Sequence, residues 1–174
     1  MVNALTCLLR KKIPGETPLE EEVERIGRDL RAGIDAVFGH SLAIRELDTG
    51  SDNAAEIEIN NLTNPFYDCE RFGISFVASP RHADVLIVTG AVTHNMAGAA
   101  RKTYEAMPSP KFVVAVGDDA CDGGIFRGTY GVLGGAEALF PVDLKIPGNP
   151  PSPLQILAGL LALMEQAGKK KSGE

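Results

Sequence analysis

Acidic side chains gather in two loops of this 174-residue chain. The segment GDDACDGG (residues 117–124) follows an apolar run and carries Asp118, Asp119 and Asp122, while Asp52 lies in the segment GSDNAAE after another strand-like run. Oxygen ligands of this kind suit Mg²⁺ or Ca²⁺. The spacing of a calcium-binding loop is absent, however, and Asp in turns usually bonds its own backbone. The residues alone therefore favour ordinary turns and predict no metal site.

The candidate bases and nucleophiles are scattered along the chain. None of the three histidines lies beside an obvious nucleophile, and each is expected at the surface or at a helix end: His40, His82 and His94. The three cysteines form no CxxC pair, which predicts reduced thiols inside a cell: Cys7, Cys69 and Cys121. Because Cys121 adjoins three carboxylates, we expect their charge to disfavour its thiolate. The sequence therefore predicts no catalytic residue.

Small residues in a loop before a helix are a further candidate site. Neither a GxxxxGK[ST] phosphate loop nor a GxGxxG after a strand is present, so the usual nucleotide fingerprints are absent. TGAVTHN (residues 89–95) is the best remaining anion cradle, because its amides would precede a helix. An ordinary strand-to-helix turn, with Thr93 or Asn95 as the N-cap, is favoured over a phosphate site.

A capping pattern also precedes a helical stretch that begins at residue 54. Either Asp52 or Asn53 is expected to cap this helix, with Glu56 reaching back to the cap. Ala55 lies three residues after Asp52, a spacing at which many proteins place two cysteines. Physical chemistry alone assigns this segment to helix initiation.

The composition describes one globular domain and limits its partners. Hydrophobic residues make up 44% of the chain, and the formal net charge is −6. A nucleic-acid-binding surface needs basic residues concentrated on one face, so nucleic acid is not an expected partner. The longest apolar segment, Pro153–Met164, is shorter than the roughly 20 residues that cross a bilayer. Any link to a membrane is therefore expected to pass through a partner.

Alternating apolar runs and helical patterns determine where these loops lie. Residues 19–37 repeat apolar side chains every three or four positions, which predicts an amphipathic helix that starts at Thr17 and Pro18 and ends near Gly39. Five strand-like runs follow: Ser41–Leu47, Phe72–Ser79, Ala83–Gly90, Lys111–Gly117 and Val142–Gly148. Helical patterns lie between and after them: Ala54–Leu62, Asn95–Met107 and Pro153–Gln166. This alternation predicts an open parallel sheet with helices on both faces, whose ligand-binding loops share one edge.

Four longer segments, within Ser41 to about Met164, resemble a known family. They are SLAIRELDTGSDNAAEIEI, NNLTNPFYDCERFGISFVASPRHADVLIVTGAVTHNM, VVAVGDDACDGGIFRGTYGVLGG and PVDLKIPGNPPSP. These segments resemble the small, cluster-bearing subunit of membrane-bound NiFe hydrogenases, including formate hydrogenlyase, and the equivalent B subunit of respiratory complex I. The resemblance implies a flavodoxin-like α/β fold and an oxidoreductase assembly in which this subunit relays electrons through one [4Fe-4S] cluster.

The resemblance also identifies where the cluster ligands of the family would lie. Those ligands are four cysteines, found in GSCNGCxIEI, VGxCA and PGCPP. Their positions in this chain hold other residues: Asp52, Ala55, Asp119 and Asn149. Because a cubane cluster needs thiolates or close substitutes, we expect no cluster and no other cofactor here. The chain is then expected to be a non-redox subunit of a hydrogenase-like or complex I-like assembly.

Partners, location and domain limits follow from the same resemblance. A hydrogenase large-subunit-like protein and membrane subunits are the expected partners, which would hold the chain at the cytoplasmic, inner face of the membrane. The implied contact residues are Arg71, Phe72, Pro80, Arg81, Phe126 and Arg127. An isolated chain is expected to form a homodimer through an exposed apolar face. The expected divisions are an N-terminal helical segment at 1–40, the flavodoxin-like domain at 41–167 and a disordered tail at 168–174.

Two alternatives stay open. One is an electron-transfer subunit whose cluster is held atypically, through Asp52, Asp119, Cys121 and another group. The other is a repurposed module that binds a flavin, a nucleotide or a divalent cation at the loops Thr89–Asn95 and Gly117–Gly124. The chain has seven Phe, three Tyr and no Trp, which counts against the stacking of a flavin ring.

Overall fold

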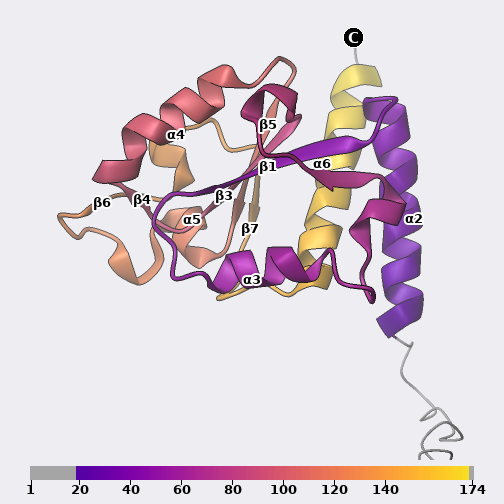
Figure 1. Cartoon of the computed structure of the whole chain (residues 1–174), viewed down its shortest axis with the longest axis horizontal. Coiled ribbons are helices and arrows are strands. Elements are labelled where there is room, and N and C mark those ends of the chain that lie inside the picture. Colours follow the sequence, from indigo (N-terminus) through magenta and orange to yellow (C-terminus); the bar gives the residue numbers. More distant parts are fainter. Residues whose placement is uncertain (1–18, 173–174) are drawn as a thin grey trace, which may run out of the picture.

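The centre of the molecule is a five-stranded parallel sheet (Figure 1). The computed structural model describes residues 19–172, of which the last three are described by their backbone alone. Thr17, Pro18 and Cys7 lie outside the described residues. The strands are β1 (Leu42–Asp48), β2 (Ile74–Phe76), β3 (Val85–Thr89), β5 (Phe112–Val116) and β7 (Leu144–Ile146). Their order, β2-β1-β3-β5-β7, is the flavodoxin-like order, which confirms the predicted fold class.

The pairing register aligns the carboxyl ends of four strands. Asp48 of β1 pairs with Thr89 of β3, Thr89 with Val116 of β5, and Val116 with Ile146 of β7. Because these strands are parallel, the chain leaves the sheet four times at the same edge. The loops rich in Gly, Asp and Asn therefore meet there, as the sequence predicts.

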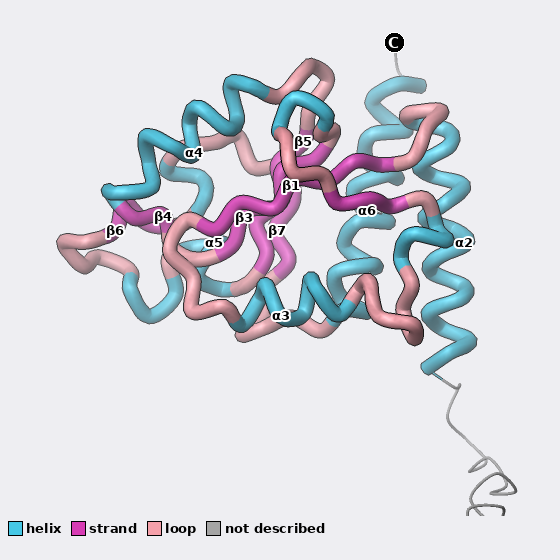
Figure 2. Tube along the Cα trace, in the orientation of Figure 1, coloured by secondary structure: helices cyan, strands magenta, loops and turns pink. Residues whose placement is uncertain are grey.

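Helices cover both faces of the sheet (Figures 1 and 2). One core lies under α2 (Leu19–Val37), α3 (Ala54–Asn61) and α6 (Pro153–Ser172), and α2 and α6 pack against each other. The other core lies under α4 (His94–Ala106) and the short α5 (Asp118–Asp122). The helix that the spacing of apolar residues predicts at 19–37 is thus confirmed.

Strand β3 illustrates why the central runs are continuously apolar. All five of its residues are buried. Val85 and Ile87 belong to the core under α2 and α6, whereas Leu86 and Val88 belong to the core under α4. A strand buried on both faces has no polar side to alternate with, so it reads as an unbroken apolar run.

The two terminal helices bear on the predicted divisions of the chain. Helix α6 continues to Ser172, so residues 168–172 are helical rather than a disordered tail. Helix α2 contributes the fully buried Leu30 and Ile34 to the same core as α6 and the sheet. Helix α2 is therefore packed into the same core as the sheet.

The second predicted strand, Phe72–Ser79, is also corrected. Only β2, at its centre, is extended, because a 3-10 turn, η1 (Cys69–Phe72), ends at Gly73 in the left-handed conformation. A second turn, η2 (Pro80–His82), follows β2, and Ser79 accepts a hydrogen bond at its start. The sequence also did not reveal a two-stranded antiparallel ribbon, which is made by β4 (Val92–Thr93) and β6 (Val132–Gly134). Two further 3-10 turns are η3 (Gly124–Phe126) and η4 (Ala136–Ala138).

Between residues 19 and 172, no helix has both the length and the apolar character that crossing a bilayer needs.

The contact between α2 and η1 yields the first prediction. A Cβ at Gly27 would overlap the ring of Phe72, whereas a Cβ at Gly98 of α4 would meet nothing. We expect Gly27→Ala to lower the free energy of unfolding by about 1–3 kcal/mol, because overpacking outweighs the helix propensity of alanine. Gly98→Ala is the matched control and should raise it by up to about 1 kcal/mol. Urea unfolding of both variants measures this, and a stabilised Gly27→Ala would contradict the tight contact.

Candidate functional site

A small hollow lies at the carboxyl edge of the sheet, where the four loops meet. It is lined by Ser51, Asp52, Ala54, Ala55, Gly90, Val116, Gly117, Asp118, Asp119, Gly148, Asn149 and Pro150. Each of the four loops contributes residues to this lining. The loops can be followed in Figure 2 from the ends of β1, β3, β5 and β7. The structure therefore brings together all four positions that the family resemblance singles out: Asp52, Ala55, Asp119 and Asn149.

The loop after β1 is held by its own backbone. Asp48 Oδ1 accepts hydrogen bonds from the N–H groups of Gly50 and Ser51, both at 2.8 Å. Asp52 Oδ1 accepts one from the N–H of Ala54 at 3.0 Å. These bonds turn the chain out of the sheet and into α3, and they present Asp52 at the rim of the hollow.

The predicted capping box at this helix is wrong. Asn53 precedes α3 in the left-handed conformation and its side chain makes no capping bond. Glu56 is only 8% exposed, and neither of its carboxylate oxygens has a hydrogen-bond partner among the described residues. The first turn packs so closely on the core that Glu56 is buried instead of folding back. The prediction that Thr93 caps the next helix is confirmed, because its hydroxyl accepts from the N–H of Met96 at 3.3 Å.

The acidic loop after β5 is a short helix, α5, rather than the expected turn. Asp118 connects it to the loop after β7: its N–H donates to Gly148 O at 2.9 Å, and its Oδ1 accepts from Gly148 N–H at 2.8 Å. The Asp119 carboxylate lies against Gly124, where a Cβ would overlap it. This glycine thus allows Asp119 to fold over the start of η3.

Three carboxylates converge on the hollow without a neutralising cation. Burial raises the pKa of Asp119, and the charges of Asp52 and Asp118 raise this pKa further. Among the described residues, no ion pair joins these three side chains to a basic one. Arg127 is close by, but it pairs with Asp122. The hollow is therefore a concentration of negative charge.

The residues at the hollow do not fit a [4Fe-4S] cluster. Such a cluster is held by four thiolates, whereas the four positions offer two carboxylates, one amide and one methyl group. The cavity has a volume of about 10 Å³, which is the room that a single water molecule needs. Within residues 19–169, no group of three or more His, Cys, Asp and Glu side chains is arranged to hold a metal ion.

The two described cysteines lie away from the hollow. Cys69 belongs to the core under α2 and α6, and Cys121 belongs to the core under α4 and donates to Ala115 O at 3.7 Å. The pKa of each thiol is raised to about 11. Burial is the main cause in both cases, so the expected charge effect on Cys121 is secondary. The pKa values make both thiols poor nucleophiles, as predicted for Cys121.

The six residues implied as partner contacts do not form one surface. Phe72 is only 5% exposed and packs against α2, while Arg71 pairs with Glu24 of α2 and lies over the Phe72 ring. These two side chains contribute to the packing on α2, and their role as partner contacts stays a prediction. Pro80 and Arg81 lie on η2, before β3, whereas Phe126 and Arg127 follow α5 beyond the end of β5. Of the implied set, only Phe126 and Arg127 are exposed near the hollow.

Sequence reasoning missed the most exposed apolar side chains near the site. Tyr130 is fully exposed and Ile125 is 84% exposed, and both lie in the loop between α5 and β6. The segment GIFRGTYGVLGG alternates glycines with apolar residues, a composition that could have indicated a projecting loop. The three histidines are all exposed, as expected.

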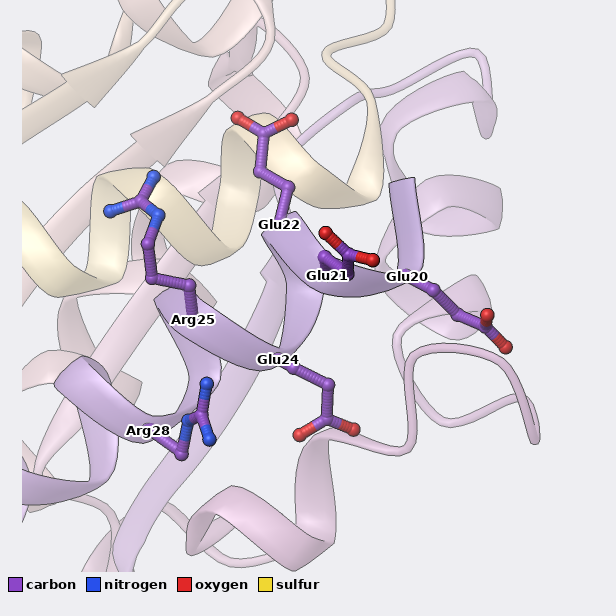
Figure 3. A pocket seen from close by; sticks show the side chains of 6 residues that line it. All are labelled: Glu20, Glu21, Glu22, Glu24, Arg25 and Arg28. Carbon is purple, nitrogen blue, oxygen red and sulfur yellow. The ribbon is translucent and has the colours of Figure 1, made fainter. Parts of the chain in front are cut away.

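The described lining of a second, larger hollow forms no site. Its volume is about 840 Å³, and its described lining consists of Glu20, Glu21, Glu22, Glu24, Arg25 and Arg28. All six lie on α2, and Figure 3 shows their charged groups spread along the outside of this helix. Side chains from one helix do not converge on a common point, so this is a solvated helix face.

Comparisons with known proteins give the chain its relatives. The family model described as NADH ubiquinone oxidoreductase, 20 Kd subunit, matches residues 53–163. Formate hydrogenlyase subunit 7 of Escherichia coli (strain K12) is 40% identical over 165 residues, which cover 93% of this chain and 65% of that protein. The probable membrane-bound hydrogenase subunit mbhJ of Pyrococcus furiosus is 39% identical over 137 residues, with coverages of 79% and 82%. The chain thus spans just under two thirds of the formate hydrogenlyase subunit.

A solved structure agrees with these relatives. It is a chain of the membrane-bound sulfane sulfur reductase, an archaeal respiratory membrane complex. That chain and the present one superpose with a TM-score of 0.66 at 34% identity, over 76% of the present chain and 73% of the other. By their names, the relatives are subunits of larger assemblies.

The convergence of carboxylates predicts a pH-dependent stability. The pKa of Asp119 is raised by folding, so its charged form destabilises the native state, and the fold loses stability as pH rises from the unfolded pKa of about 4 through the folded pKa. We expect Asp119→Asn to stabilise the protein at pH 7 by less than about 1 kcal/mol. The gain should vanish near pH 3, where both states carry a protonated Asp119. Urea unfolding at the two pH values measures this, and no gain at pH 7 would contradict the repulsion.

The buried Glu56 gives a second prediction for this region. Because its carboxylate is buried without a partner, we expect Glu56→Met to raise the free energy of unfolding by about 1–3 kcal/mol. Glu58, on the same helix, is partly exposed and accepts a hydrogen bond from Asn61, so Glu58→Met should change stability by less than about 0.5 kcal/mol. Thermal and urea unfolding compare the two variants. A destabilised Glu56→Met would indicate that this carboxylate has a stabilising partner.

Proposed function

The chain belongs to the family of the NADH ubiquinone oxidoreductase 20 Kd subunit, and we propose that it is a non-redox subunit of a hydrogenase-like or complex I-like membrane-associated assembly. The observation that carries this proposal is the hollow at the sheet edge. It gathers Asp52, Ala55, Asp119 and Asn149 at one point, yet offers no thiolate there. A cluster relay needs such ligands, so the chain keeps the scaffold without the means to carry electrons.

The relatives support the part of the proposal that concerns assembly. Both curated relatives are named as subunits, of formate hydrogenlyase and of a membrane-bound hydrogenase, and the solved relative belongs to a respiratory membrane complex. We propose that this chain likewise docks on a hydrogenase large-subunit-like protein and, with membrane subunits, lies at the cytoplasmic face of the membrane. The exposed Phe126 and Arg127 are its proposed contacts there.

An atypically ligated cluster is the first alternative. It would need Cys121 to join Asp52 and Asp119 at the hollow. The Cys121 thiol is buried under α4 and bonded to Ala115 O, and its pKa of about 11 opposes thiolate formation. These observations favour the non-redox proposal.

A small-ligand module is the second alternative. The hollow of about 10 Å³ is far below the several hundred Å³ that enclose a flavin or a nucleotide. The neighbouring groove of about 380 Å³ is large enough, but its lining includes three carboxylates, which repel a phosphate group. The loop at residues 89–95 is occupied by a conventional cap, with Thr93 bonding Met96. A cation is the ligand class that the charge of the hollow favours.

Iron analysis tests the proposal, and restoration of the ligands provides its control. After anaerobic purification and reconstitution with iron and sulfide, we expect the chain to hold no stoichiometric iron and to be colourless. The variant Asp52→Cys/Ala55→Cys/Asp119→Cys/Asn149→Cys should bind about four irons per chain and absorb visible light. The same variant with Ala55→Ser in place of Ala55→Cys is the matched control and should hold iron poorly. About four irons in the unaltered chain would overturn the non-redox proposal.

Association is tested separately from iron. The chain, co-expressed with a hydrogenase large-subunit-like protein from the same source, should co-purify with it at equal stoichiometry while remaining free of iron. Co-purification that fails while each protein is folded alone would remove the assembly part of the proposal. Size-exclusion chromatography of the isolated chain reports whether it pairs with itself instead.

A further inference from the structure

An apolar arm, defined as residues 124–134, projects beside the hollow. Tyr130 is fully exposed and Ile125 is 84% exposed, while Phe126 and Leu133 are also exposed. In Figure 1 the arm is the orange loop that extends beyond the sheet between α5 and β6. Large apolar side chains that cluster on one exposed segment mark a binding surface rather than ordinary surface variation.

Polar and backbone bonds hold the arm in shape without its apolar side chains. Arg127 pairs with Asp122 and its Nε donates to Asp122 O at 3.1 Å. Thr129 donates from its hydroxyl to Phe126 O at 2.9 Å, and β6 pairs with β4 at the far end. The loop therefore keeps its shape through polar and backbone bonds, and its apolar side chains stay exposed.

The arm and the carboxylates share one groove. This groove has a volume of about 380 Å³ and is lined by Asp118, Asp119, Asp122, Gly124, Ile125, Arg127 and Asn149. Three of its residues, Asp118, Asp119 and Asn149, also line the hollow. A ligand that covers Ile125 thus approaches the carboxylates of the hollow.

The charge of the groove selects the kind of ligand. Arg127 is committed to Asp122, which leaves Asp52, Asp118 and Asp119 without a described cation. A bare metal ion is disfavoured because the described side chains form no metal-binding group. A cation carried on an apolar surface fits both the acidic groove and the arm, since complementary charges fix the register of an interface.

We propose that a partner protein docks on the apolar arm and places one lysine or arginine side chain, set in an apolar surface, in the groove beside Asp119, with its charged group at the rim of the hollow near Asp52. This inference rests on the proposed function and deepens it: a basic side chain of the partner would occupy the positions where the family resemblance implies a cluster. The carboxylates neutralise this cation, and the arm buries the apolar surface around it.

Short peptides test the chemistry of the inserted side chain. The probes are the acetylated, amidated hexapeptides GLFRLG, GLFKLG and GLFQLG, titrated into the folded chain while the backbone N–H signals of Ala54 and Gly148 are followed by NMR. We expect the Arg and Lys peptides to bind at least about tenfold more tightly than the Gln peptide, with affinity falling as salt rises. Equal binding of all three peptides, or no binding of the basic ones, would overturn the inference.

Variants assign the binding to the carboxylates and to the arm. Asp52→Asn and Asp119→Asn should each weaken the Arg peptide severalfold and leave the Gln peptide unchanged. Because Asp119→Asn is expected to stabilise the fold, its loss of binding would not reflect unfolding. Tyr130→Ser should weaken all three peptides, and Glu105→Gln, on the exposed side of α4, is the control that should change nothing. If Glu105→Gln weakened binding of the Arg peptide as much as Asp119→Asn does, net charge alone would explain the attraction. That result would overturn the inference.

The failure of this inference is distinguishable from the failure of the proposed function. Iron bound by the unaltered chain would remove the non-redox proposal, whichever peptide binds. The other case is an iron-free chain that co-purifies with a large-subunit-like protein. If Asp52→Asn/Asp119→Asn then leaves that association and its salt dependence unchanged, the proposed assembly is supported and the proposed basic side chain is ruled out.

Discussion

The alignment of four strand ends is the constraint on which the site depends. Parallel pairing places Asp48, Thr89, Val116 and Ile146 in one row, and two apolar cores hold the sheet from both sides. A slip of one residue would turn each apolar side chain of β3 to the opposite core. Because β3 and β5 are packed on both faces, the row is rigid, and the loops that leave it have defined starting points.

Hydrogen bonds extend this order from the strands into the loops. The buried hydroxyl of Thr49 donates to Thr89 O at 2.9 Å and to Gly90 O at 3.1 Å, and Thr93 donates to Thr49 O at 2.9 Å. Asp118 and Gly148 join the remaining two loops. None of these bonds uses the side chains at positions 52, 55, 119 or 149. The bonds that join the loops to one another are therefore independent of these four side chains, whereas Asp52 acts within its own loop through the N–H of Ala54.

Unbalanced charge and exposed apolar surface occur together at the same edge. Burial and, after it, the charges of Asp52 and Asp118 raise the pKa of Asp119, and the neighbouring arm exposes Ile125 and Tyr130. Either feature alone costs the isolated chain little. Side by side, they describe a surface whose complement is both cationic and apolar. Glu56 differs from them, since its carboxylate is buried in the scaffold beneath α3 rather than presented to a partner.

The sequence by itself determined the fold class and the place of the site. The spacing of three and four in α2 reports a helix with one buried side, and the unbroken apolar runs of β3 and β5 report strands covered on both faces. Alternation of these patterns sufficed to predict one edge where the loops meet. The family resemblance then located Asp52, Ala55, Asp119 and Asn149 there.

Only the tertiary structure decided what depends on neighbours distant in sequence. Phe72 lies in a strand-like run, yet the close approach of Gly27 draws it under α2 and leaves β2 only three residues long. Cys121 lies within the acidic loop in sequence, but α5 turns its thiol into the core under α4, where burial is the main cause of its raised pKa. Glu56 fits a capping box, yet the packing of α3 buries it. The spacing of apolar residues along the sequence predicts which residues are buried. Which element covers each of them depends on the packing of the whole chain.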